Sequence, residues 1–139
     1  QRLQGYSIKH DISVSVSRIP DFIARADAAL AAAVPGIRLV CFGHVGDGNL
    51  HYNQSRPAGM SDEAFRAVEE EVHARVHAIV AELQGSISAE HGIGRLKQAA
   101  FLQYKPALAV SLMQRIKHAL DPASLFNPGR LLPRSSSST

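Results

Sequence analysis

Cysteine and clustered positive charge are scarce in this sequence, and long apolar runs are missing from it. One cysteine among 139 residues excludes an internal disulfide framework and favours a reducing compartment such as the cytoplasm. No apolar run approaches the roughly 20 residues of a membrane span, so no span is expected. The 15 lysines and arginines are scattered, so a net charge of +3 gives little support for a nucleic-acid partner, and none is expected.

What the sequence does have is enough apolar residues for a core and an unusual number of histidines. A hydrophobic fraction of 45% in 139 residues suits one compact domain and does not suit a disordered chain. Seven histidines remain to be explained. Composition therefore points to histidine chemistry on a small globular fold.

Hydrophobic periodicity predicts an α+β fold. Strict alternation or short apolar runs predict strands, and apolar stripes at helical spacing predict helices. The expected strands are 8–17, 37–44, a strand around 50–53 and a short one at 86–90; the expected helices are 20–35, 61–85 and 106–121. This order is that of a ferredoxin-like βαββαβ antiparallel sheet with its helices on one face, plus a C-terminal helix. Residues 1–132 would form the domain and 133–139 a disordered tail.

The second and third strands bring two histidines together. If Asp47 and Gly48 were the two residues of a tight hairpin loop, His44 would stand directly opposite His51. Directly opposed residues have Cβ atoms about 4.5–5.5 Å apart on one face of the sheet. Two imidazoles at that separation can share a metal ion.

Side-chain parity along the strands adds three polar residues to the same uncovered face, namely Lys9, Asn53 and Glu90. Two imidazoles and a carboxylate form the ligand set of a metal with an open coordination position. A lysine and an asparagine beside them suit an anionic ligand that carries a carboxylate. Parity sends Cys41 to the opposite, core side, where a packed thiol is expected.

The other histidines have competing interpretations. His91 either continues its strand and faces the core, or swings beside the predicted metal where glycines bend the chain, and spacing alone leaves both open. His73 and His77 have the i, i+4 spacing of zinc ligands, but they flank the apolar stripe of a helix and are expected to be boundary residues. His10 is expected to be a hydrogen-bonded interior residue, and His118 a surface residue.

Four segments carry a resemblance that covers nearly the whole chain: KHDISVSV (9–16), FGHVGDGNLHYN (42–53), GSISAEHGIGRLKQ (85–98) and FNPGR (126–130). In this order they resemble the C-terminal domain of FAD-linked oxidases. The similarity is to the D-2-hydroxyglutarate and D-lactate dehydrogenase branch of the vanillyl-alcohol-oxidase-type flavoproteins. The resemblance implies that a divalent metal, usually zinc, is held by His44, His51 and Glu90. It also implies that His91 accepts the substrate hydroxyl proton, and that Lys9, Asn53 and His91 contact the substrate.

The resemblance further implies a flavin-dependent D-2-hydroxy acid dehydrogenase. Such an enzyme oxidises a substrate such as D-2-hydroxyglutarate, D-lactate or glycolate to the 2-oxo acid, with hydride transfer to FAD and onward transfer to an external electron acceptor. The FAD-binding domain of the family is not found within these residues, so the chain is expected to be part of a longer enzyme and inactive alone. The alternative is a non-catalytic ferredoxin-like module that binds a metal or a small molecule.

Overall fold

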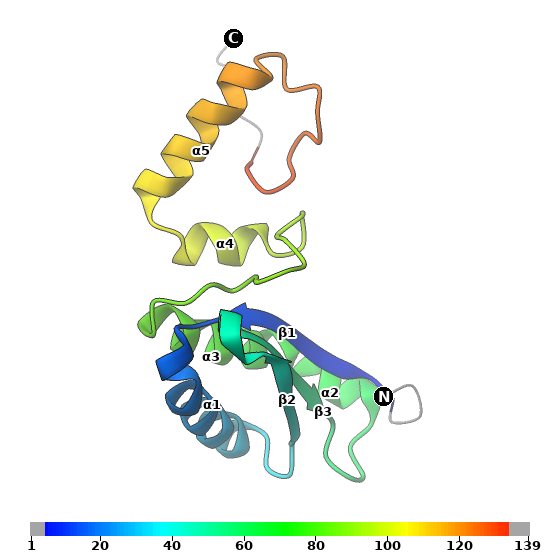
Figure 1. Ribbon diagram of the computed structural model, residues 1–139. Coiled ribbons are helices and arrows are strands. Elements are labelled where there is room, and N and C mark those ends of the chain that lie inside the picture. Colours follow the sequence, from blue (N-terminus) through cyan, green and yellow to red (C-terminus); the bar gives the residue numbers. More distant parts are fainter. Residues whose placement is uncertain (1–4, 134–139) are drawn as a thin grey trace. The chain divides into compact units, whose positions relative to one another are not determined.

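The computed structural model describes residues 5–133, and the chain divides into two compact units, residues 1–91 and 92–139. The first unit contains a three-stranded antiparallel sheet of order β1-β3-β2, formed by β1 (Ser7–Ser13), β2 (Arg38–His44) and β3 (Asn49–Ser55). Its main helices are α1 (Ile19–Ala33) and α3 (Glu69–Glu82), with the short α2 (Asp62–Ala67) before α3 (Figure 1). The α+β class is therefore confirmed.

Helices α1 and α3 cover one face of the sheet, which we call the covered face. Ile8, Ile12 and Tyr52 point to it from the strands and are fully buried. Phe22 of α1 packs edge-on against Tyr52, with ring centroids 5.3 Å apart. From α3 the side chains of Val72, Val76 and Val80 are also fully buried. The opposite face of the sheet, which we call the open face, carries the alternate residues of each strand.

The connection between β2 and β3 is longer than a two-residue hairpin, so the predicted pairing of His44 with His51 was wrong. Val45–Asp47 forms a 3-10 turn that ends at Gly48, whose φ is +69°. A Cβ on Gly48 would lie 1.9 Å from the carbonyl oxygen of Val14, so this close approach requires glycine. His44 therefore pairs with Asn49, and His51 pairs with Phe42. A shift of two residues keeps side-chain parity, so both histidines still lie on the open face.

Two other predicted strands are shorter in the structure. β1 ends at Ser13 because a 3-10 turn, Val16–Arg18, follows at once. The predicted fourth strand, 86–90, is reduced to a single bridge between Ser13 and Ser86. Beyond that bridge the backbone amides of 89–91 donate mainly to the side chain of Asp11, and only that of Ala89 also donates to a β1 backbone carbonyl among the described hydrogen bonds.

The helix predicted over 61–85 is divided in two at Val68, where φ is −98° and ψ is 1°. The predicted N-cap is confirmed, since the Ser61 hydroxyl accepts a hydrogen bond from the amide of Ala64 at 3.1 Å.

The second unit contains α4 (Gln98–Tyr104), which the sequence analysis did not predict, and α5 (Ala107–Leu120). The predicted C-terminal helix is confirmed by α5, which ends just before Asp121. Asp121 then fastens the following loop, accepting hydrogen bonds from the amides of Leu125 and Phe126 at 2.9 Å each. Its hydrogen bond with Lys117 lowers the pKa of the Asp121 carboxyl to about 2.

Across residues 5–133, the helices are too short or too polar to cross a bilayer. The predicted tail, apart from Pro133, lies outside the described residues.

Candidate active site

Asp11 organises the open face. It lies within the edge strand β1, and only 2% of its surface is exposed. Its carboxylate accepts hydrogen bonds from the backbone amides of Ala89, Glu90 and His91, at 3.1, 3.0 and 2.9 Å. Hydrogen bonds to an ionised carboxylate are stronger than those between neutral groups. This one side chain therefore fixes the segment that carries Glu90 and His91.

Glu90 reaches between the two predicted metal-ligating histidines. Its Oε1 lies 3.6 Å from Nε2 of His44, and its Oε2 lies 3.7 Å from Nε2 of His51. Its Oε1 also accepts a hydrogen bond from the side-chain amide of Asn49 at 2.5 Å. The structure therefore brings His44, His51 and Glu90 together although the two histidines are not directly opposed.

His51 stands between two carboxylates. While its Nε2 faces Glu90, its Nδ1 lies 3.8 Å from Oδ1 of Asp11. A carboxylate behind a ligating imidazole fixes the tautomer and the ring orientation, an arrangement common at metal sites. His51 thus has its Nδ1 on the side of Asp11 and its Nε2 on the side of Glu90.

His91 faces the open side and not the core, because its side chain is 65% exposed. Its ring stacks on that of His51, with centroids 5.5 Å apart and an interplanar angle of 20°. Its Nδ1 lies 3.8 Å from Oδ2 of Asp11. A proton on Nδ1, directed at that carboxylate, leaves Nε2 as the basic nitrogen.

Lys9 and Asn53 stand directly opposite each other in the pairing of β1 with β3. Lys9 is exposed, whereas Asn53 is 7% exposed. The next opposed pair on the same face of these strands is Asp11 and His51. The predicted substrate-binding residues therefore lie one step along the open face from the histidine and carboxylate cluster.

The donor set fits a divalent cation. In Asp11, His51 and His91 the ligand atoms all lie within 4.8 Å of one another. In the predicted group, Glu90 lies 3.6 Å from His44 and 3.7 Å from His51. The Asp11 oxygens already accept three backbone amides, which a cation would have to outcompete. In the described part of the chain, the Glu90 carboxylate accepts a hydrogen bond from one group, the side-chain amide of Asn49. Near it the buried Oδ1 of Asn49 has no hydrogen-bond partner, which leaves one further oxygen acceptor beside Glu90.

Comparison with known proteins decides the family. The family described as "FAD linked oxidases, C-terminal domain" matches residues 1–131. The chain belongs to this family. A D-2-hydroxyglutarate dehydrogenase of Xanthomonas citri pv. viticola is 43% identical over 123 residues, which is 88% of this chain and 26% of that protein.

Two further relatives of this FAD-linked oxidase domain show the same proportions. The mitochondrial D-2-hydroxyglutarate dehydrogenase of Rattus norvegicus is 40% identical over 129 residues, 93% of this chain and 23% of that protein. An uncharacterized FAD-linked oxidoreductase of Mycobacterium tuberculosis is 38% identical over 119 residues, 86% of this chain and 24% of that protein. The chain thus spans about a quarter of the length of these relatives.

The sequence analysis missed Asp11 as a site residue of this FAD-linked oxidase domain. The available signal was parity, because Asp11 is two residues from Lys9 and shares its face of the strand. Parity could not reveal what Asp11 binds, since the amides it accepts lie 78 to 80 residues further along the chain.

Proposed function

We propose that this chain is the substrate-binding and metal-binding domain of a flavin-dependent D-2-hydroxy acid dehydrogenase. The observation that carries the proposal is the position of Glu90 between His44 and His51, with His91 stacked on His51, on the open face of a FAD-linked oxidase domain. The names of the relatives favour D-2-hydroxyglutarate as the first substrate to test. D-Lactate and glycolate remain the alternatives.

His44, His51 and Glu90 would hold the metal, and zinc suits this ligand set. When bound, a divalent cation lowers the pKa of a coordinated hydroxyl group and polarises it. Lys9 would pair with a substrate carboxylate, and Asn53, opposite it in the sheet, would orient the substrate by hydrogen bonding. FAD, held by another domain of the enzyme, would accept the hydride, and an external acceptor would take the electrons onward.

His91 would take the proton of the substrate hydroxyl at Nε2. Its Nδ1 lies toward the Asp11 carboxylate, which would stabilise the imidazolium that forms. Asp11 would then be a positioning residue, because it orients both His91 and His51 without touching the substrate itself. From the single cysteine we further propose a reducing, cytoplasmic location.

The test uses the complete flavoprotein with FAD bound and follows flavin reduction after anaerobic mixing with each of the three acids. We expect His91→Gln to slow reduction about 100-fold or more, the usual contribution of a general base. His118→Gln is the matched control, since His118 is exposed on α5, and its rate should equal that of the unchanged enzyme.

Metal analysis completes the test. His44→Ala/His51→Ala should remove the metal of the open face and abolish flavin reduction. A protein that binds FAD and metal but whose flavin is reduced by none of the three acids would be a non-catalytic binding module. The assignment of His44 and His51 as metal ligands would be rejected if the double variant and the unchanged protein bound the same amount of metal. Metal bound at other sites is subtracted from both values.

A further inference from the structure

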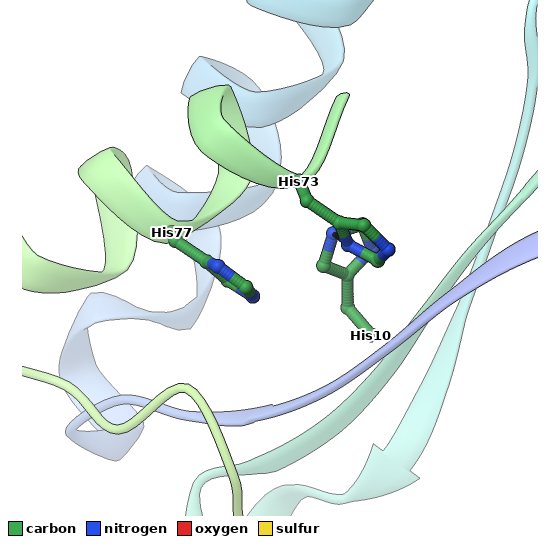
Figure 2. A group of neighbouring side chains, drawn as sticks. All are labelled: His10, His73 and His77. Carbon is green, nitrogen blue, oxygen red and sulfur yellow. Dashed lines mark hydrogen bonds between the residues drawn. The ribbon is translucent and has the colours of Figure 1, made fainter. Parts of the chain in front are cut away.

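A second histidine cluster lies on the covered face, which we call the covered histidine cluster. It consists of His10 on β1 and of His73 and His77 on α3, and both α3 rings project toward β1 (Figure 2). The ring centroids are 4.6 Å apart for His10 and His73, 5.5 Å for His10 and His77, and 5.6 Å for His73 and His77. His10 is 2% exposed and His77 6%. The three ligand nitrogens lie within 4.8 Å of one another.

The outer nitrogens of two of these rings face hydrogen-bond acceptors. Nδ1 of His10 lies 3.2 Å from the backbone carbonyl oxygen of Tyr52. A carbonyl oxygen only accepts, so this Nδ1 carries the proton and Nε2 carries the lone pair. Nε2 of His73 lies 3.5 Å from a carboxylate oxygen of Glu69, which favours a proton on that nitrogen and a lone pair on Nδ1.

The remaining nitrogens of His10 and His73, which we call the inner nitrogens, face each other. Nε2 of His10 and Nδ1 of His73 are 2.8 Å apart. At this distance one ring donates an N–H to the lone pair of the other, or a cation lies between the two lone pairs. His10 and His73 therefore each have an oxygen acceptor behind the ring, as metal-ligating histidines commonly do.

We propose that His10, His73 and His77 bind one divalent transition-metal cation, with zinc as the best match to three imidazoles. Zinc–nitrogen bonds of 2.0–2.1 Å place neighbouring ligands of a tetrahedral site about 3.3 Å apart. The His10–His73 contact must therefore open by roughly half an ångström and His77 must move inward, which small side-chain rotations supply.

Burial supports this ligand role. Desolvation by burial, together with the neighbouring His73 and His77, holds the pKa of His10 well below its usual value.

The site has an entrance and is separate from the open-face site. The His73 side chain is 33% exposed, so a cation can enter past it and a water can complete the coordination. His10 lies between Lys9 and Asp11 in β1, but its side chain points to the opposite face. A metal here would link α3 to the strand that presents the open-face residues, and its binding does not depend on the proposed dehydrogenase activity.

The experiment uses the 139-residue chain with His44→Ala/His51→Ala, which removes the open-face ligands. After treatment with a chelator, Co²⁺ is added and the visible d–d absorption of the tetrahedral ion is recorded, followed by displacement with Zn²⁺. We expect one Co²⁺ per chain. Adding His73→Asn should weaken binding about 100-fold, whereas the matched control His118→Asn should leave it unchanged.

Two results would overturn the proposal: no tetrahedral Co²⁺ in the double variant, or undiminished binding after His73→Asn. The first result, with a stable fold, would mean that a shared proton occupies the cluster. If His73→Asn does not fold, X-ray absorption of the zinc-loaded double variant counts the imidazole ligands. Three imidazoles support the site, and two or fewer reject it.

Discussion

The two faces of the sheet both carry histidines, but they place them in different surroundings. On the open face, His51 and His91 lie beside the carboxylates of Asp11 and Glu90 and are partly exposed. On the covered face, His10 is almost fully buried among apolar side chains and two further histidines. Adjacent residues of β1 thus lie in different environments, because successive side chains of a strand point to opposite faces of the sheet.

The difference shows where stability and chemistry reside in this domain. The covered face buries the large apolar side chains, so its hydrophobic contacts stabilise the fold. The open face leaves Val40 and Phe42 46% and 51% exposed and places its polar residues within reach of a ligand. Among the charged residues of the described strands, Asp11 is the one that is strongly buried. Its carboxylate holds the loop that carries Glu90 and His91.

Truncating one phenylalanine on each side gives the largest expected contrast. Phe22→Ala should lower the free energy of unfolding by about 3–5 kcal/mol, because a fully buried ring is replaced by a cavity against Tyr52. Phe42→Ala, on the open face, should cost less than about 1 kcal/mol. Urea unfolding followed by circular dichroism measures both. Similar losses for the two variants would mean that the open face also contributes to the core.

The second contrast tests Asp11 as the exception on the open face. Asp11→Asn should lower the free energy of unfolding by about 2–4 kcal/mol, because a buried carboxylate loses its charge-assisted bonds to three backbone amides. The exposed Asp47 in the β2–β3 loop is the control, and Asp47→Asn should change stability by less than about 0.5 kcal/mol. Hydrogen exchange at residues 89–91 should accelerate only in the Asp11 variant. Unchanged exchange there would show that the loop is held by other contacts.

Local patterns in the sequence predicted the elements and faces, because alternation and helical stripes depend on neighbouring residues. They predicted β2, α1 and α5 nearly to their ends, and they placed Lys9, His44, His51 and Asn53 on one face. The hairpin register was wrong because it depends on a distant contact. Gly48 lies against Val14, and its carbonyl oxygen accepts the Val14 amide at 3.0 Å.

Two further features that were not predicted also depend on long-range contacts. Whether 86–90 forms a strand depends on competition between β1 and the Asp11 side chain for the same amides, which no local pattern records. The spacing of His73 and His77 shows that they share one side of a helix, but not that this side meets His10. Their partner is set by how α3 packs on β1, and therefore only the structure reveals the cluster.

Cys41 provides the smallest and most selective test of the two faces. It alternates with Phe42 and faces the covered side, where burial, and to a lesser degree the charge of Asp27, raises the pKa of its thiol. Since the thiolate is the nucleophile, alkylation by iodoacetamide at pH 8 should be several times slower in the folded chain than in urea. The midpoint of its pH profile should also lie at higher pH in the folded chain. Asp27→Asn should move the midpoint part of the way back, whereas Asp47→Asn should not move it. Steric shielding alone would lower the rate at every pH without shifting the midpoint, so an unshifted profile would contradict the environment that we assign to Cys41.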